Sequence, residues 1–476
     1  MSSVHDQAMQ YVYRQVLQRL MERFSQAQRA SLQLLIQRVI VAAGGYERVG
    51  SFKVMYAHGG GKDSVHALAF LRAAQLSIAA RAQTTFNLRI ATARHAGVTA
   101  DVIANIERGY SALFVQDDPR VEVLVLDDGV MQPFNSAQLS SPNQRQADRN
   151  DLLLAGHLAG GVACPPFCGC CYAGLADLYR HAMAWDGGVD AVISADPLPE
   201  RKRYLAWGRR KLRRAGVGLS AQVATFPRAM IDALSAVRRQ HLQRLLGLPL
   251  QTQYFSGNQR PLRFIAIDDL VHQPFDAECE VLNAFLGFQC SEHSCVLSES
   301  DCATPLLSAH LWGLRREHVH GQCYTDGVSD YLRRASIRMQ RKQMSPLLQR
   351  EVLAAWQGAD QLALRRQQAA DLATQAYGLS EAQLICLLFA PFIEGGKRLE
   401  AFLRQCHPGM LVALPYMHKA LREQRAPEPV VQWLVNISGL SLSTLQTLYW
   451  LEAETLSKTL CHPVSDLSPG RAMASR

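Results

Sequence analysis

The sequence predicts an α/β fold with a parallel sheet, on the evidence of strand-like runs, their spacing and the overall composition. Five short apolar, β-prone runs occur along the chain, separated by stretches long enough to hold helices. Strands that alternate with helices form right-handed crossovers, which produce a parallel sheet covered on both faces. Hydrophobic residues make up 48% of the 476 residues and charged residues 19%, which predicts a large buried core rather than extensive disorder.

Residues 1–50 are predicted to form a helical segment ahead of the sheet. Apolar residues recur at helical spacing between residues 5 and 43, and Gly44 and Gly45 end this pattern. We therefore expect two helices before the first strand.

No targeting or membrane segment is expected. Asp6, Arg14 and Arg19 interrupt any apolar core that a secretory signal would need in this region. The longest apolar stretches, such as residues 384–393, are about ten residues long, whereas a bilayer span needs roughly 20. A cytoplasmic location is the resulting expectation, and the cysteines are then expected to be thiols or metal ligands rather than disulfides.

Residues 51–345 are predicted to form the main domain, which contains the sheet. Its five expected strands are residues 52–57, 87–93, 121–126, 189–194 and 263–267. Glycine-rich or acidic turns follow the first four of these strands. Because ligands of parallel sheets bind at the carboxyl ends of the strands, we expect these turns to converge on one cleft.

Residues 346–476 are predicted to form a separate helical domain. Strand signals vanish in this part of the chain and helical periodicity dominates, for instance over residues 362–372 and 379–388. The end of the chain, residues 465–476, is expected to be a disordered tail.

A glycine-rich loop between the first strand and the next helix predicts a phosphate site. Residues 58–64 read His-Gly-Gly-Gly-Lys-Asp-Ser. Glycines let the backbone approach a ligand closely, and the following helix N-terminus offers free N–H groups to an anion. Lys62 can neutralise phosphate charge, Asp63 can hold the Mg²⁺ that accompanies a nucleoside triphosphate, and Ser64 can donate to a phosphate oxygen. The spacing excludes a Walker A loop and a dinucleotide fingerprint.

Residues 60–64, Gly-Gly-Lys-Asp-Ser, resemble the PP-loop, which is the Ser-Gly-Gly-x-Asp-Ser signature of the N-type ATP pyrophosphatase superfamily. The leading serine of the family falls on Gly59. The next predicted strand ends in Arg-His-Ala-Gly at residues 94–97, similar to the His-Gly found near the adenine in many relatives. The resemblance covers roughly residues 50–340. It implies an adenine nucleotide alpha hydrolase-like (HUP-type) sheet, here with helical N- and C-terminal extensions.

The resemblance also implies chemistry at the α-phosphate of ATP. ATP is split into AMP and pyrophosphate, and the AMP is transferred to a substrate oxygen. The implied cofactors are ATP and Mg²⁺, and the expected binding residues are Gly59, Gly60, Gly61, Lys62, Asp63, Ser64 and His95. Lys62, Asp63 and Ser64 are also the expected catalytic residues, since catalysis here is positioning and charge neutralisation. Three aspartates that follow predicted strands are candidates for nucleotide or magnesium binding: Asp127, Asp128 and Asp196.

Seven of the twelve cysteines fall in two clusters. The first is Cys-Pro-Pro-Phe-Cys-Gly-Cys-Cys at residues 164–171, and the second spans residues 290–302. Paired cysteines suit tetrahedral zinc, and three with an open position suit an iron–sulfur cluster. The predicted metal ligands are Cys164, Cys168, Cys171, Cys290 and Cys295.

The positions of both cysteine clusters are similar to those in the tRNA 2-thiocytidine synthetase and related sulfur-transferase branches of the superfamily. These branches carry a Cys-x2-Cys between the third and fourth strands and another cysteine after the fifth, a position that makes Cys302 a candidate catalytic thiol. Some amidotransferase relatives that modify sugars also carry paired cysteines, so the clusters leave the nucleophile open.

The net charge of +9 is concentrated in residues 200–216, where eight lysines or arginines accompany one glutamate. A local basic face favours a polyanionic ligand, either nucleotide phosphates or an RNA backbone. A solvated helix face is the alternative. Tyr204 and Trp207 lie among these cations and suggest some capacity for base stacking.

Together these features predict an ATP-dependent, AMP-forming enzyme that adenylates a substrate oxygen and then installs sulfur. The expected partners are ATP, a tRNA or a small-molecule carbonyl or carboxyl substrate, and a protein that donates sulfur or ammonia. One alternative is a nitrogen-transferring ligase that forms an amide, amidine or nitrile. Another is a non-catalytic nucleotide sensor.

Overall fold

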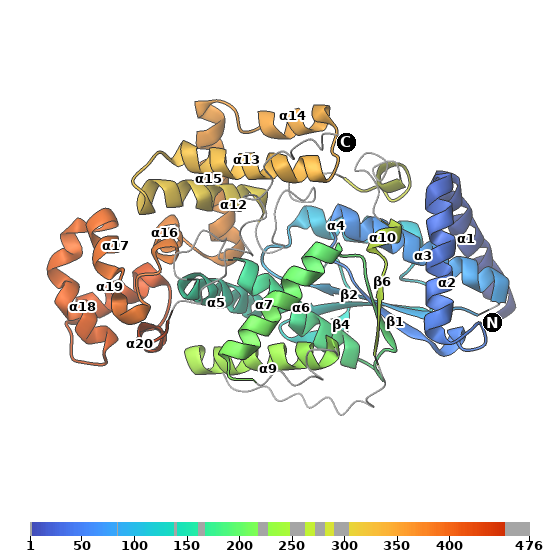
Figure 1. Ribbon diagram of the computed structural model, residues 1–476, viewed down its shortest axis with the longest axis horizontal. Coiled ribbons are helices and arrows are strands. Elements are labelled where there is room, and N and C mark those ends of the chain that lie inside the picture. The colour runs from blue at the N-terminus through green and yellow to red at the C-terminus, as the bar shows by residue number, and fades with distance from the viewer. Residues whose placement is uncertain are drawn as a thin grey trace, which may run out of the picture.

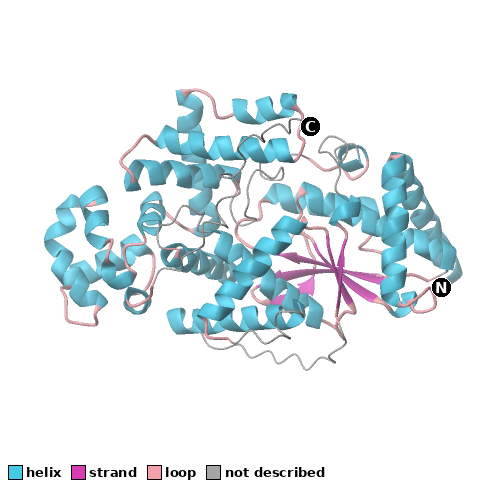
Figure 2. Ribbon diagram, viewed as in Figure 1, coloured by secondary structure: helices cyan, strands magenta, loops and turns pink. Residues whose placement is uncertain are grey.

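The computed structural model describes residues 2–82, 84–137, 140–159, 167–217, 227–247, 262–271, 281–289 and 304–452. A central sheet is flanked by helices, and a further group of helices extends beyond it at one end of the molecule (Figure 1 and Figure 2). The predicted α/β class is confirmed. No helix in the described part of the chain combines the length and the apolar character needed to cross a bilayer.

The sheet contains six strands in the described residues. They are β1 (Lys53–Ala57), β2 (Asn87–Ala93), β3 (Val121–Asp127), β4 (Val130–Pro133), β5 (Ala191–Ser194) and β6 (Arg263–Ala266). Their spatial order is β4-β3-β2-β1-β5-β6, and every neighbouring pair is parallel except β3 and β4. The five predicted strands are therefore confirmed.

The edge strand β4 lies outside the predicted set. It pairs antiparallel with β3 through a two-residue turn, in which Asp128 and Gly129 have φ angles of 52° and 69°. A type I′ turn requires positive φ at both central residues, and Asp-Gly is a typical sequence for it. Asp128 and Gly129 therefore connect two paired strands and do not simply end one strand.

Helices cover both faces of the sheet. α3 (Lys62–Ala82) and α4 (Ala100–Leu113) pack on one face and α6 (Phe167–Ala184) on the other. Around them lie α5 (Pro142–Leu158), α7 (Leu198–Arg214), α9 (Pro227–Leu246) and α10 (Asp268–Val271). Val54 and Tyr56 of β1 pack in a core with α3 and α4, whereas Met55 packs with α6 on the opposite face. Strands buried on both faces are mostly apolar, so the polar side chains that could contact a ligand are expected at the strand ends.

The predicted N-terminal helical pair is confirmed as α1 (Ser2–Arg23) and α2 (Gln26–Ala43). Ser25 caps α2, because its side chain accepts a hydrogen bond from the Gln28 N–H and the Gln28 side chain accepts one from the Ser25 N–H. Gly44 ends α2 in the left-handed conformation with φ of 89°. Apolar residues of both helices pack in the same core as α3.

After β6 the described residues form helices and turns. The helices are α12 (Pro305–Leu314), α13 (Tyr324–Arg341), α14 (Pro346–Ala354), α15 (Ala359–Tyr377), α16 (Glu381–Phe389), α17 (Leu399–Cys406), α18 (Leu414–Leu421), α19 (Glu428–Ser438) and α20 (Leu442–Tyr449). Shorter helical turns in this part are η2 (Arg315–Val319), η3 (Glu394–Gly396) and η4 (Pro408–Ala413), and a further one, η1 (Val49–Ser51), precedes β1. Residues 465–476, the predicted tail, lie outside the described residues.

α5 packs closely against the C-terminal helices. A Cβ at Gly156 would lie 2.2 Å from Leu387 Cγ of α16, so this packing requires glycine. The neighbouring His157 is fully buried, with its ring 5.6 Å from the Phe392 ring. Neither ring nitrogen has a hydrogen-bond partner among the described residues, and burial lowers the pKa of His157 to about 4. The core therefore holds a neutral imidazole.

Acid should destabilise the fold through His157. Between pH 6.5 and 4 the unfolded chain binds a proton at this residue and the folded chain does not, so the free energy of unfolding falls as the pH falls. The difference between the two pKa values corresponds to roughly 3 kcal/mol. Urea unfolding of wild type and His157→Leu at several pH values measures the effect, and the variant should show the smaller loss. An equal pH dependence in the wild type and the variant would contradict the prediction.

Candidate functional site

The strand order creates a switch point beside β1. The chain proceeds from β1 through β2 to β3 on one side, and then places β5 and β6 on the other side of β1. In parallel sheets, ligands bind at the carboxyl ends of the strands where the order reverses in this way. Here that point lies between the glycine loop after β1 and Asp196 after β5, so both predicted features flank it.

The glycine loop turns sharply at Gly60. Its φ is 73°, and a Cβ at this position would lie 2.7 Å from the Ile106 side chain and 2.8 Å from the Val102 side chain of α4. A residue other than glycine would meet both steric and backbone strain here. At Gly59 the situation differs, because a Cβ would have no neighbour within 4 Å.

Ser64 holds the loop closed from the first turn of α3. Its Oγ accepts a hydrogen bond from the Gly59 N–H at 3.1 Å. The Tyr56 hydroxyl donates to the Ser64 carbonyl oxygen at 2.9 Å, which ties the end of β1 to the start of the helix. As an acceptor from Gly59, the Ser64 hydroxyl retains its own proton for donation, as the predicted phosphate contact requires.

Two lysines meet at Asp63. Lys62 Nζ lies 3.1 Å from one carboxylate oxygen, and Lys342 Nζ, just after α13, lies 2.9 Å from the other. Burial acts to raise the pKa of Asp63, but Lys342 and Lys62 together lower it well below its usual range. The carboxylate is therefore ionised, and the cluster carries a net positive charge at the N-terminus of α3, which suits an anion.

The loop after β2 contains His95 beside a perturbed carboxyl. The Gly97 N–H donates to His95 Nδ1 at 3.2 Å, and burial lowers the pKa of His95 to about 4. The neutral ring then carries its proton on Nε2, where it can donate to a ligand. Asp148 of α5 accepts a hydrogen bond from the Ala96 N–H at 2.6 Å, and burial raises its pKa to about 6.

A buried ion pair lies at the end of β3. Asp127 is 3% exposed and Arg94 is 5% exposed, and Arg94 Nη1 lies 3.7 Å from Asp127 Oδ2. Neither carboxylate oxygen of Asp127 has a hydrogen-bond partner among the described residues, and Arg94 donates from Nη2 to the Asn135 carbonyl. Since a buried carboxylate without hydrogen bonds is unfavourable, Asp127 is suited to accept a donor or a cation from a ligand. Asp128, by contrast, is occupied in the β3–β4 turn.

Asp196 after β5 is exposed and belongs to the same electrostatic environment as Asp63. Its carboxylate accepts a hydrogen bond from the Ser194 hydroxyl at 2.8 Å. Burial raises the pKa of Glu200 in the next helix, and Lys342 opposes this effect. Asp196 and Asp63 both raise the pKa of that same carboxyl, so the fold brings these predicted residues into one region.

Lys342 is a residue of the candidate site that the sequence alone does not single out. It lies 279 residues from Asp63 in the chain and follows an ordinary amphipathic helix. No local motif marks it, because its role depends only on where α13 packs.

Of the predicted cysteine ligands, the described residues include only Cys171 with its side chain. Cys164, Cys290, Cys295 and Cys302 lie outside the described residues, as does the side chain of Cys168. Cys171 is half-buried on α6, while the Cys170 thiol donates to the Asp151 carbonyl at 3.2 Å. Within the described ranges, no three histidine, cysteine or acidic side chains are grouped so as to hold a metal ion.

The basic segment forms α7. Lys202, Arg209 and Arg213 are exposed on it. Tyr204 and Trp207 do not extend toward solvent for base stacking. They pack against Tyr172 of α6, with ring centroids 5.4 Å from it, and so hold α7 in place.

Comparison of the chain with known protein families, with curated proteins and with solved structures found no match.

The two loop glycines should respond differently to alanine. Gly60→Ala should lower the free energy of unfolding by about 2–4 kcal/mol, since left-handed strain and overpacking add together. Gly59→Ala meets neither obstacle and should change it by less than about 1 kcal/mol. Urea denaturation of the two variants provides the comparison. Equal stability of both would show that the loop does not have the sharp bend at Gly60.

Proposed function

We propose that the protein is an ATP-dependent, AMP-forming enzyme with the HUP-type fold of the N-type ATP pyrophosphatases. The observation that carries the proposal is the cluster of Lys62, Asp63 and Lys342 at the N-terminus of α3, beside the switch point of the sheet. A helix N-terminus with two ammonium groups favours a polyphosphate. His95 and Asp196, at neighbouring strand ends, are polar groups that can contact the rest of a nucleotide.

Asp63 fits the role of a magnesium ligand. Its low pKa keeps it ionised, and a carboxylate oxygen is a donor that Mg²⁺ prefers. Mg²⁺ bound with ATP would supply charge neutralisation on the phosphates. Asp127 offers a second carboxylate without hydrogen-bond partners among the described residues, although it is placed two strands away from β1.

The proposed reaction is attack by a substrate oxygen on the α-phosphorus of ATP. A new O–P bond forms, the bond between the α-phosphorus and the bridging oxygen breaks, and its electron pair leaves with pyrophosphate. Lys62 and Lys342 would stabilise the charge on pyrophosphate, and the N–H groups of the glycine loop would hold it in position. The product is an adenylated substrate, from which AMP can be displaced.

We further propose that a sulfur nucleophile displaces AMP, with tRNA as a candidate substrate. The exposed cations of α7 support an RNA partner, because this helix starts directly after β5 and so extends from the edge of the site. Cys170 is unsuited as the nucleophile, since burial raises the pKa of its thiol well above the usual value and the thiolate is the reactive form. In the alternative enzyme, a nitrogen nucleophile would displace AMP, and the adenylation of the substrate oxygen would be the same.

Loss of the Asp63 carboxylate should abolish AMP formation. Incubation of the chain with Mg²⁺ and ATP labelled at the α-phosphate should produce AMP and pyrophosphate slowly, with water as acceptor. Asp63→Asn should slow this by at least about 100-fold, because the carboxylate proposed to hold the Mg²⁺ on the phosphates is removed. Chromatography of the labelled nucleotides measures the rate.

The control for this experiment is Asp371→Asn, on the exposed surface of α15. Binding of an ATP analogue with a methylene bridge between the α- and β-phosphates provides a second readout that needs no acceptor. Formation of ADP in place of AMP, a wild-type rate in Asp63→Asn, or no binding of the analogue by the wild type would contradict the proposal.

The sulfur step predicts a metal ion or cluster held by the two cysteine clusters. Cys168→Ser should lower the zinc or iron content of anaerobically purified protein, because a sulfur ligand is removed. Elemental and sulfide analysis measure the content per chain, with the exposed Cys323 changed to Ser as control. Unchanged metal content in Cys168→Ser would count against a ligand role for that residue.

A further inference from the structure

A chain of hydrogen bonds connects the turn that follows β3 with the loop that follows β2. The side-chain oxygen of Gln144, near the start of α5, accepts a hydrogen bond from the Asp128 N–H at 2.7 Å. The amide nitrogen of Gln144 donates to Asp148 Oδ1 at 2.7 Å, and the Ala96 N–H donates to Asp148 Oδ2 at 2.6 Å. Asp148 is therefore the point at which α5 holds the loop, directly beside His95.

The loop held by Asp148 determines how the His95 ring lies. The Val98 N–H donates to the His95 carbonyl oxygen at 2.9 Å, and the Gly97 N–H donates to His95 Nδ1 at 3.2 Å. These two contacts lie within the loop, whereas the contact with Asp148 comes from a helix. Because the peptide unit that joins His95 to Ala96 is planar and stiff, a shift of the Ala96 N–H would move His95 as well.

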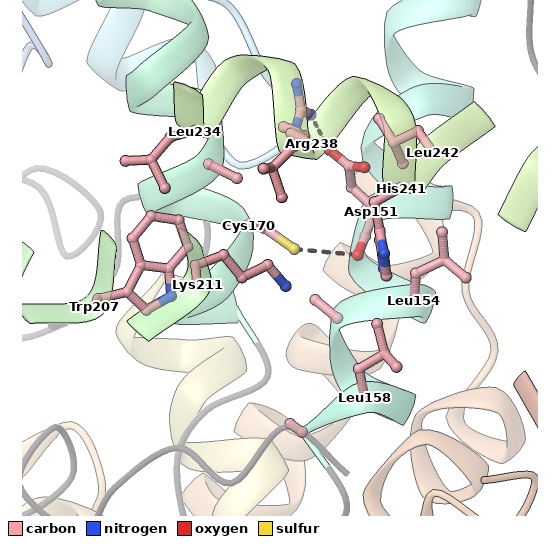
Figure 3. A pocket seen from close by; sticks show the side chains of 14 residues that line it. Asp151, Leu154, Leu158, Cys170, Trp207, Lys211, Leu234, Arg238, His241 and Leu242 are labelled. Carbon is pink, nitrogen blue, oxygen red and sulfur yellow. Dashed lines mark hydrogen bonds and ion pairs between the residues drawn. The ribbon is translucent and has the colours of Figure 1, made fainter. Parts of the chain in front are cut away.

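The next turn of α5 is held from two neighbouring helices. Arg238 of α9 pairs with the Asp151 carboxylate and with Asp177 of α6 (Figure 3). The Cys170 thiol of α6 donates to the Asp151 carbonyl oxygen at 3.2 Å. α5 is thus a firm support for the Asp148 carboxylate, which lies one turn earlier on the same helix.

The two donors around Asp148 fit its ionised form. Each carboxylate oxygen already faces an N–H group, so a proton on either oxygen would displace one of the two hydrogen bonds. The hydrogen bond that remained would go to a neutral group and would be weaker. A reversed Gln144 amide could accept that proton only by giving up the Asp128 N–H. Protonation of Asp148 therefore loosens the connection between α5 and the loop.

The surroundings of Asp148 bring this protonation close to neutral pH. Burial raises the pKa of Asp148 to about 6; Asp151 acts in the same direction, and Arg238 opposes it. Burial lowers the pKa of His95 to about 4 and raises the pKa of the Cys170 thiol well above its usual value. Both of these neighbours therefore stay neutral while Asp148 changes its charge between pH 8 and 5.

We propose that the ionised Asp148 carboxylate positions the loop after β2, and with it His95, for nucleotide binding. The inference rests on the proposed function, which takes His95 to contact the nucleotide. Asp148 is a positioning residue, because it acts through the backbone of the loop and not on the ligand. Nucleotide affinity falls as the pH drops through the pKa of Asp148, since the protonated carboxyl no longer holds both donors.

The test is the pH dependence of nucleotide binding in the wild type and in Asp148→Asn. The asparagine has an NH₂ group in place of one oxygen, so it imitates the protonated carboxyl at every pH. Calorimetry of the full chain with Mg²⁺ and the methylene-bridged ATP analogue measures both dissociation constants. At pH 8 the variant should bind roughly fivefold more weakly, because a charge-assisted hydrogen bond is lost. The ratio of the two constants should fall toward one at pH 5.

Use of the ratio removes the titration of the analogue itself, which is the same for both proteins. The control is Asp371→Asn on the exposed surface of α15, which should bind as the wild type does at every pH. Circular dichroism at each pH shows whether the chains stay folded. A ratio that stays constant between pH 8 and 5, or a ratio of one at pH 8, would overturn the inference alone. No binding by the wild type at any pH would overturn the proposed function and this inference with it.

Discussion

The Asp63 carboxylate lies between two ammonium groups, 3.1 Å from Lys62 Nζ and 2.9 Å from Lys342 Nζ. Lys62 is only 4% exposed, and a buried ammonium without a counter-charge is strongly unfavourable, so Asp63 stabilises the loop while no anion is bound. The same carboxylate connects the start of α3 to the residue that follows α13. This contact therefore sets the charge of the candidate site, and it adds to the packing of α5 and α9 against the C-terminal helices.

The topology explains why this contact occurs where a ligand can reach it. The chain leads from β1 to β2 on one side, while β5 lies on the other side, and connections that diverge in this way generally form a crevice at the carboxyl ends of the strands. The glycine loop lies at these strand ends. Gly60 bends the chain close to Ile106 of α4, and α3 begins two residues later. Further along the edge, Asp127 is buried with incomplete hydrogen bonding, which is the condition expected of a group that meets a ligand.

Local patterns were sufficient to predict the five parallel strands, the N-terminal helical pair and the loop at residues 58–64, because each is determined by neighbours in sequence. A local signal for β4 was also present in the sequence, because Asp-Gly, here residues 128 and 129, is typical of a two-residue hairpin turn. The sequence analysis treated this pair only as the end of the third strand. Lys342 had none, since only the packing of α13 brings it to Asp63. The orphaned Asp127 was identifiable as a strand-end acid, but its burial beside Arg94 depends on tertiary structure.

α5 connects the loop after β2 with the core of the C-terminal helices. Asp148 on this helix accepts the Ala96 N–H in the loop after β2, while Gly156 and His157 lie a little over two turns later against the C-terminal core. Protein interiors are close-packed, so a helix held at both ends cannot shift at one end without disturbing the other. Any displacement of the C-terminal helices would thus alter the loop after β2 through α5 and the loop after β1 through Lys342. Two independent connections of this kind keep the strand ends and the C-terminal helices in a fixed arrangement around the proposed nucleotide.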